Sequence, residues 1–257
     1  MKQTILVWTT WSIASIVFAT AIGIAVASAA DSFSAEQISL FGKCEKSPPA
    51  TQIQECSAAI DSKLFQGAQL VGLLVNRANA YDANGDKDSA LKEYNRAVEL
   101  APDSAGIYYN RGVLFVSQKD YDSALKDYDT AIRLNPGYVA ALYNRGRIFE
   151  FKNDFARAQA DFSEAIRLAP KAAIVYRERG SVYLWVNQFQ RAVDDENEAI
   201  EIEPAMAYAY YLRGIAYAKL GDNDKASSDT QKAVQLDPKL LQLIKLNGQS
   251  LAPTPAQ

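Results

Sequence analysis

The chain has 257 residues, 22% of them charged, and a formal net charge of -3 at pH 7. This small negative charge, with no run of basic residues, argues against electrostatic capture of nucleic acid or of an anionic membrane surface. The sequence contains no histidine. A histidine-based catalytic triad, a histidine proton shuttle and the usual zinc sites are therefore excluded.

Residues 1–30 differ in composition from the rest of the chain. An uncharged stretch runs from Thr4 to Ala30, and Ala27–Ala30 offers the small residues that a signal peptidase requires, with cleavage after Ala29 or Ala30. The stretch is also long enough to span a bilayer. We favour a cleaved signal peptide and a periplasmic or secreted protein; the alternative is a retained segment that anchors the protein in the inner membrane.

Two cysteines, Cys44 and Cys56, flank the turn-forming segment Lys46–Ala50, between helical patterns near Glu36–Glu45 and Thr51–Leu64. A disulfide between them would close a helical hairpin and stabilise it by about 2–3 kcal/mol. An exported protein meets an oxidising environment, which favours the disulfide. A pair of free buried thiols is the alternative, and two cysteines without histidine do not predict a metal site.

The chain is periodic from about residue 71 to residue 240. Five prolines follow one another at intervals of 34 residues: Pro102, Pro136, Pro170, Pro204 and Pro238. That period is typical of a helix-turn-helix unit that must stack on copies of itself, and each proline ends the second helix of its unit. The sequence therefore predicts an array of five units at about 71–104, 105–138, 139–172, 173–206 and 207–240.

Other residue types recur in phase with the prolines. Small residues occupy three columns, namely Ala90, Ala124, Ala158, Ala192, Ala226; Ala97, Ala131, Ala165, Ala199, Ala233; and, on the first helix, Ala78, Gly112, Gly146, Gly180, Gly214. Aromatic residues follow the third column at Tyr81, Phe115, Phe149, Tyr183 and Tyr217. This alternation of small and large residues suits an interdigitated core. Aspartates at Asp86, Asp120, Asp154 and Asp222 are good N-caps for the second helices.

These columns resemble the tetratricopeptide repeat (TPR) family, and exported bacterial TPR proteins in particular. The resemblance implies an all-α fold, a right-handed α-solenoid of helix-turn-helix repeats. The Trp-x-x-Leu-Gly opening of the family pattern is replaced by Tyr or Leu followed by x-x-Arg-Gly or Arg-Ala. The aromatic of the second helix, present as Tyr94, Tyr128 and Phe162, becomes Glu196 and Thr230 in units four and five. We expect these two units to pack less tightly or to face something polar.

The ends of the array are atypical. Cys56–Ile60 parallels the pattern of Leu91–Val98, so residues 31–70 are predicted to form a degenerate N-terminal hairpin. Beyond the last unit, a short helix at Lys239–Leu246 is too apolar to be freely exposed and is predicted to cap the array. A homodimer contact through this helix is the alternative. The remaining residues to 257 are predicted to be a disordered tail.

Charged columns also repeat in every unit. Acidic residues lie nine positions before each proline, at Glu93, Asp127, Asp161, Asp195 and Asp229, and arginines occupy the first helix at Arg77, Arg111, Arg145, Arg179 and Arg213. We predict a ladder of ion pairs and carbonyl contacts between helices; an anion-binding stripe is the alternative. No catalytic set lies outside the repeated columns, so the chain is predicted not to be an enzyme and to need no cofactor.

Candidate binding residues come from columns that change along the array. The column before the arginines reads Asn76, Asn110, Asn144, Glu178 and Leu212, and a TPR array presents its first helices along a concave groove. Asparagine amides suit the backbone of an extended peptide; alternatively, they tie helix to helix. The predicted peptide site comprises Asn76, Asn110, Asn144, Tyr109, Tyr143, Arg147, Arg177 and Tyr211.

Together these observations predict a non-enzymatic, exported scaffold that binds a peptide or a protein segment in its concave groove. The alternative is a structural assembly component, anchored in the membrane or self-associating. The first predicts a protein partner and no nucleic acid, whereas the second predicts contact through the ends of the chain. The fold alone does not decide between them.

Overall fold

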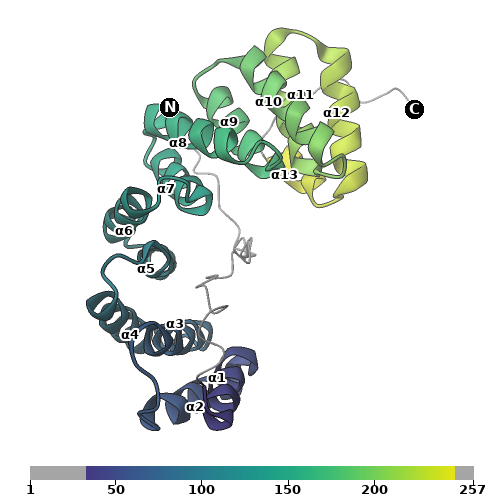
Figure 1. Cartoon of the computed structure of the whole chain (residues 1–257). Coiled ribbons are helices and arrows are strands. Elements are labelled where there is room, and N and C mark those ends of the chain that lie inside the picture. Colours follow the sequence, from purple (N-terminus) through teal and green to yellow (C-terminus); the bar gives the residue numbers. More distant parts are fainter. Residues whose placement is uncertain (1–32, 247–257) are drawn as a thin grey trace.

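The protein is an arc of paired helices (Figure 1). The computed structural model describes residues 33–246, and this part of the chain is entirely helical, with thirteen helices and no strand. The all-α solenoid predicted from the columns is confirmed. The predicted signal peptide and C-terminal tail lie outside the described residues. Within 33–246, no helix combines the length and the apolarity that a membrane crossing requires.

The helices follow one another in antiparallel pairs. Their bounds are α1 Ala35–Lys46, α2 Pro49–Asp61, α3 Gly67–Ala83, α4 Lys87–Leu100, α5 Ala105–Ser117, α6 Tyr121–Leu134, α7 Val139–Phe151, α8 Phe155–Leu168, α9 Ala173–Trp185, α10 Phe189–Ile202, α11 Ala207–Leu220, α12 Asn223–Leu236 and α13 Leu240–Leu246. Unit one is the pair α3 and α4, and the following pairs are units two to five, of which the last is α11 and α12. The first helix of a unit lies on the inner side of the arc, as α5 does relative to α6 in Figure 1.

Each unit turns and restarts in the same way. The residue between the two helices of a unit has a positive φ in every unit, at Gly85, Lys119, Asn153, Asn187 and Gly221. A side-chain carboxylate then caps the second helix in four units, where Asp86, Asp120, Asp154 and Asp222 accept a backbone N–H three residues on. The predicted caps are confirmed. Unit four has Gln188 at this place, without a side-chain cap.

Contacts between small and aromatic residues set the distance between the two helices of a unit. A Cβ added to Gly112 would lie 2.7 Å from Cε1 of Tyr128, and one added to Gly146 would lie 2.8 Å from Cε1 of Phe162. Cβ atoms do not approach other atoms so closely, so an alanine at Gly112 or Gly146 would force the ring to move. Both rings are completely buried. The predicted interdigitation therefore holds, with the second-helix aromatic as the large partner.

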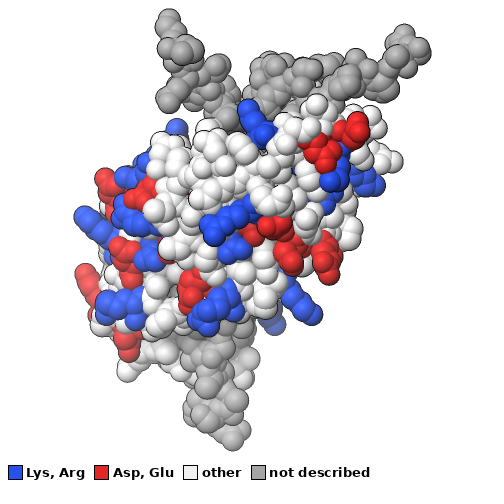
Figure 2. Space-filling view, turned by 90° about the horizontal axis from the view of Figure 1, so that it is seen from above, with Lys and Arg blue, Asp and Glu red and all other residues white. Residues whose placement is uncertain are grey.

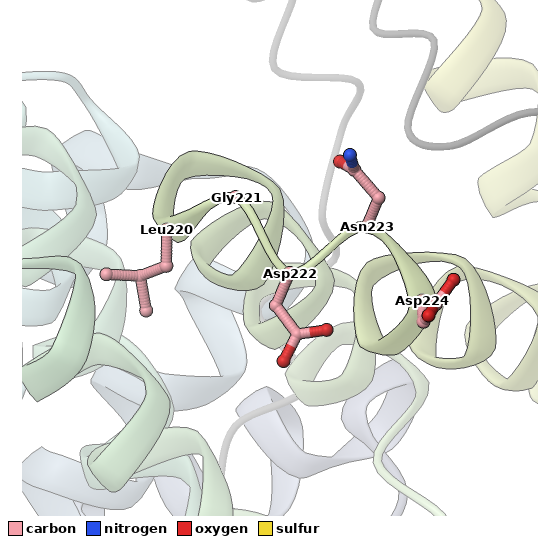
Figure 3. A pocket seen from close by; sticks show the side chains of 5 residues that line it. All are labelled: Leu220, Gly221, Asp222, Asn223 and Asp224. Carbon is pink, nitrogen blue, oxygen red and sulfur yellow. The ribbon is translucent and has the colours of Figure 1, made fainter.

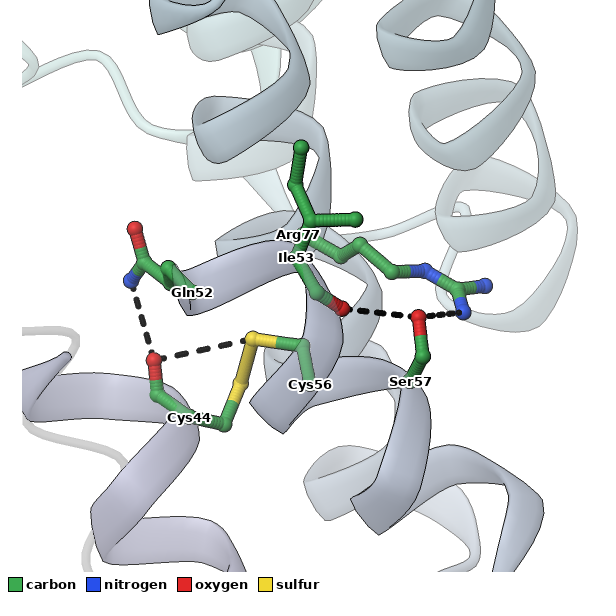
Figure 4. Close-up of a disulfide and its surroundings, with 6 residues drawn as sticks. All are labelled: Cys44, Gln52, Ile53, Cys56, Ser57 and Arg77. Atoms are coloured by element: carbon green, nitrogen blue, oxygen red, sulfur yellow. Dashed lines mark hydrogen bonds between the residues drawn. A yellow bond between two sulfur atoms is a disulfide. The ribbon is translucent and has the colours of Figure 1, made fainter. Parts of the chain in front are cut away.

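The N-terminal hairpin is closed by the predicted disulfide between Cys44 and Cys56 (Figure 4). Gln52 adds a link, since its Nε2 donates to the carbonyl oxygen of Cys44 at 2.9 Å. The hairpin docks on unit one through Arg77, whose Nη1 donates to Oγ of Ser57 at 3.1 Å. Arginines of the later units bond to the preceding unit in the same way, so the hairpin continues the array.

The disulfide takes the place of an aromatic residue. Ser57 of the hairpin corresponds to Asn95 of unit one, because each accepts a bond from the arginine of the following unit. On this alignment Cys56 corresponds to Tyr94. The connector after α2 is shorter than predicted, because α3 begins at Gly67 and its first turn carries Leu70 into the core of the hairpin.

The C-terminal helix α13 lies against the last full unit, as predicted for a cap. Leu240 and Ile244 are buried in a cluster with Tyr211, Leu212 and Ala233. This burial satisfies part of the apolar surface that prompted the prediction. On the surface shown in Figure 2, acidic and basic side chains are interspersed, and neither sign forms a continuous patch.

Candidate functional site

The predicted ion-pair ladder is present in all five units, with a single bond in unit one, from Nη2 of Arg77 to Oε1 of Glu93 at 2.9 Å, and paired bonds in the others. In unit two, Nε and Nη2 of Arg111 each lie 2.8 Å from a carboxylate oxygen of Asp127. Arg145, Arg179 and Arg213 make the same paired contacts with the aspartate 16 residues on. Two parallel bonds fix both the separation and the orientation of the two helices. The ladder therefore belongs to the scaffold.

Each arginine also reaches back to the preceding unit. Nη1 of Arg111 donates to Oδ1 of Asn95 at 2.7 Å, and Arg145, Arg179 and Arg213 contact Asp129, Ser163 and Asn197 in the same way. These side chains, not the peptide carbonyls that the sequence suggested, receive the third bond. The guanidinium groups are thus occupied on both sides, which argues against an anion-binding stripe.

The asparagine column lies half-buried on the first helices α3, α5 and α7. Nδ2 of Asn144 donates to the hydroxyl of Tyr109 in the preceding unit at 3.3 Å, so this residue does tie helix to helix. Among the described residues, the side chains of Asn76 and Asn110 have no hydrogen-bond partner. These two amides keep their donors and acceptors for water or a ligand.

A group of polar and charged side chains joins the inner helices α7 and α9. It consists of Tyr143, Arg147 and Glu150 from α7 with Arg177, Glu178 and Ser181 from α9, and is called the inner cluster below. Its centre is Glu178, whose Oε1 accepts from Nη2 of Arg177 at 2.7 Å and from the hydroxyl of Tyr143 at 3.0 Å. Nε of Arg147 lies 3.8 Å from the same oxygen.

Glu150 occupies the edge of the inner cluster. One of its carboxylate oxygens accepts a hydrogen bond of 3.1 Å from Oγ of Ser181. Burial and the neighbouring Glu178 carboxylate raise the pKa of Glu150 to about 7, against the bonding effect of Ser181 and the charge of Arg147. The carboxyl therefore changes its charge near neutral pH.

Two tyrosines contribute their rings to this region, Tyr143 within the inner cluster and Tyr208 on α11 beside it. Burial raises the pKa of Tyr208 on α11 to about 12, and its ring lies 5.3 Å from the guanidinium carbon of Arg177. Burial and the adjacent Glu178 also raise the pKa of the Tyr143 phenol. Both phenols stay protonated at neutral pH, so they serve as hydrogen-bond groups and as apolar walls.

Glu196 on α10 lies in the core beneath this region. Its side chain is completely buried, and neither carboxylate oxygen has a hydrogen-bond partner. It stands where Tyr128 and Phe162 stand in units two and three, against Gly180, whose added Cβ would lie 2.5 Å from Oε1. Burial raises the pKa of Glu196 well above its ordinary value. The change from aromatic to acid was visible in the sequence, but its complete burial was not.

Five of the eight predicted site residues fall into two groups. The structure joins Tyr143, Arg147 and Arg177 in one cluster, and Asn144 with Tyr109 one unit earlier. Arg177 and Tyr211 are 7% and 3% exposed, so they present little surface to a ligand in this conformation. Ligand contact by the eight residues stays a prediction.

Sequence reasoning did not single out Glu150 or Ser181. Both belong to columns that change from unit to unit: Glu150 follows Asp82 and Val116 and precedes Leu184 at the same place in the repeat. The criterion that selected the asparagines would therefore have found them. The periodic columns gave no sign that their side chains meet across two units.

A hollow lies at the turn between α11 and α12. It is lined by Leu220, Gly221, Asp222, Asn223 and Asp224, whose side chains point in different directions (Figure 3). Asp222 is engaged in capping α12 and in an ion pair with Lys225. This hollow is a by-product of the turn. Within the described part of the chain, no group of three or more cysteines and carboxylates is placed to hold a metal ion.

The fold and the inner face define a class of protein, a helical repeat array with polar side chains along its inner helices. Models of the tetratricopeptide repeat match residues 75–139, 109–152 and 143–207, and a second such model matches 207–240. Because these matches cover more than half of the chain, it belongs to the tetratricopeptide repeat family. Among curated proteins, no match was found.

Solved structures agree with this assignment. MamA is 22% identical, with 64% of this chain and 96% of that chain covered and a TM-score of 0.60. YrrB, described as a TPR protein with an unusual peptide-binding site, is 21% identical, with 76% and 98% covered and a TM-score of 0.63. The C-terminal part of a TPR repeat-containing protein from Cytophaga hutchinsonii is 17% identical, with 82% and 81% covered and a TM-score of 0.65. At these identities the likeness concerns the fold.

Proposed function

We propose that this protein is a non-enzymatic scaffold that binds an extended segment of a partner protein along its inner face. The observation that carries the proposal is the pair of half-buried amides of Asn76 and Asn110, which have no partner among the described residues. An extended peptide carries N–H and C=O groups that such amides can satisfy. Membership of a family of interaction scaffolds supports a protein partner, as does the peptide-binding site named for YrrB.

We also propose that the protein works outside the cytoplasm. The apolar stretch and small residues of 1–30 support export, and the disulfide between Cys44 and Cys56 is suited to an oxidising compartment. The mass of the mature chain tests this proposal. Loss of 29 or 30 residues supports a cleaved signal, whereas an intact Met1 in a membrane fraction contradicts it.

The groove is tested by selecting linear peptides from a random phage-displayed library on the full chain. A selected peptide is then measured against Asn76→Ala/Asn110→Ala/Asn144→Ala. We expect affinity to fall at least about tenfold, because each lost amide leaves peptide groups unpaired. Helicity should be unchanged, and Asn223→Ala, at an exposed position on α12, should bind like the wild type. Equal affinity of the triple variant and the wild type contradicts the proposed groove.

A second candidate function is self-association through α13, favoured by Leu241, which is 42% exposed on this capping helix. Sedimentation of the full chain separates the two functions. A dimer that dissociates in Leu241→Asp would support an assembly role. A monomer across the concentration range contradicts it.

A further inference from the structure

We propose that the inner face between α7 and α9 receives a positively charged side chain, a lysine or an arginine, of the bound segment next to Glu150. This inference rests on the proposed function and specifies the chemistry of the partner. It is argued from the pairing of charges in the inner cluster, where both guanidinium groups face Glu178 and Glu150 has no ion-pair partner among the described residues.

Both arginines of the inner cluster face one carboxylate. Arg177 donates to Glu178 at 2.7 Å, and Arg147 has its nearest carboxylate contact, at 3.8 Å, with the same Oε1. Among the described residues, Glu150 and Glu196 have no ion-pair partner. The region thus holds three carboxyl groups, two of which the protein's own cations leave unpaired.

Of the two unpaired carboxyl groups, Glu196 has the more unusual environment. Its carboxyl group is completely buried without a hydrogen bond, and it interacts electrostatically with Arg177 and Glu178 of the inner cluster. Its Oε1 lies against Gly180, the residue before the Ser181 that bonds to Glu150. A buried polar group without a partner costs free energy unless something else compensates it. Because burial raises its pKa well above the ordinary value, Glu196 stays protonated and does not neutralise Arg177, whose ion-pair partner is Glu178.

Glu150 is the less buried of the two unpaired carboxyl groups. It is half-buried on the inner helix α7, beside Arg147, whose side chain is 34% exposed. The charged and titratable groups that act on it are Arg147 from α7, Arg177 and Glu178 from α9 and Tyr208 from α11. The pKa of Glu150 is raised although this set includes two arginines, Arg147 and Arg177. A further cation in the groove would stabilise the carboxylate.

The pH dependence of binding follows from the pKa of about 7 for Glu150. A cationic side chain favours the ionised carboxylate, so binding releases a proton wherever Glu150 is protonated in the free protein. Affinity should consequently rise from pH 6 to pH 8 and level off above. The opposite arrangement, a partner carboxylate on Arg147, would give affinity that does not rise over this range.

The experiment uses peptides selected from the random library at pH 8. We expect a lysine or arginine to recur at one register of the selected peptides. Replacing this residue with glutamine should weaken binding to the wild type about tenfold or more, the size expected for one close charge pair. The same replacement should have little effect on binding to Glu150→Gln, which keeps the shape of the side chain. Glu201→Gln, at an exposed position on the outer helix α10, should behave like the wild type.

The possible outcomes separate the two proposals. The cation site alone is overturned if the selected peptides depend on the asparagines but show no basic residue. It is also overturned if replacing the basic residue with glutamine weakens binding to Glu150→Gln as much as binding to the wild type. Enrichment of acidic residues does the same and points to Arg147. If no peptide is enriched, or if the peptides ignore the inner helices, the proposed function fails and the cation site with it.

Discussion

Units two and three differ from unit four at the two positions where the inner helix meets the core. In the earlier units an aromatic pair fills these positions, with ring centroids 6.0 Å apart for Tyr109 and Tyr128, and 6.1 Å for Tyr143 and Phe162. In unit four the same two positions hold Arg177 and Glu196. The ion-pair ladder is unchanged across the three units. The scaffold thus keeps its geometry while one unit exchanges apolar packing for buried ionisable groups.

The largest expected effect on stability comes from removing a second-helix aromatic of units two and three. Phe162→Ala leaves a cavity against Gly146, and we expect it to lower the free energy of unfolding by about 3–5 kcal/mol. Chemical denaturation followed by circular dichroism measures the change. Thr230→Ala, at the corresponding place in unit five, should cost less than about 1 kcal/mol, because the hydroxyl bonds only within its own helix. Similar losses in both variants would show that the ring does not set the packing.

The N-terminal hairpin extends the comparison, because a disulfide occupies the aromatic position there. Cys44→Ser/Cys56→Ser should lower the free energy of unfolding by about 2–3 kcal/mol, since the reduced unfolded chain gains freedom. Thermal melting with and without reductant checks this expectation. Reductant should shift the wild type and leave the double variant unchanged; a wild-type melt insensitive to reductant contradicts it.

Restoring the aromatic in unit four should change the free energy of unfolding in the opposite direction. Glu196→Phe removes a buried carboxyl without partners, and we expect it to raise the free energy of unfolding by about 1–3 kcal/mol. Gly180 leaves room for the ring, as Gly146 does for Phe162. Glu196→Gln, which retains polar atoms, should stabilise less. A destabilised Phe variant would mean that the carboxylate is needed to hold Arg177.

The smallest effect concerns the response to pH. Glu150 and Glu196 have pKa values above those of the unfolded chain, so folding is favoured by their protonated forms. Their contribution is complete below about pH 4.5 and is lost as pH rises, for Glu150 through about 7. The capping aspartates Asp86 and Asp120 have lowered pKa values and act in the opposite direction.

The two glutamates are isolated by comparing the wild type with Glu150→Gln/Glu196→Gln. We expect the difference in melting temperature between them to grow in favour of the variant from pH 5 to pH 7.5. A constant difference over this range would contradict the burial of unpaired carboxyl groups. Glu201→Gln provides the control for a lost charge on the surface.

Much of the fold could be predicted because it repeats. The prolines, alanines, arginines and capping aspartates recur in phase, and each recurrence adds support for the same local structure. The disulfide and the capping helix followed from composition at the ends of the array. What the columns could not give was contact between different columns: Ser181 meets Glu150 because the twist of the array sets two inner helices side by side, which a linear period does not encode.

The candidate site was only partly predictable for the same reason. Changing columns drew attention to Tyr143, Arg147 and Arg177, and the structure joins these three around Glu178. Burial depends on neighbouring units, however, so the deep positions of Arg177 and Tyr211 were not foreseen. Glu196 was noted as a departure from the pattern, but its lack of partners follows only from the packing of α10 beneath α9.

The central claim is that changing residues on the inner helices contact the partner and constant residues do not. Hydrogen exchange of the full chain, with and without a selected peptide, tests it most directly. We predict slower exchange in α3, α5, α7 and α9 when the peptide is bound, with little change in the outer helices α4, α6, α8 and α10. Protection confined to the outer helices or to α13 would contradict the account.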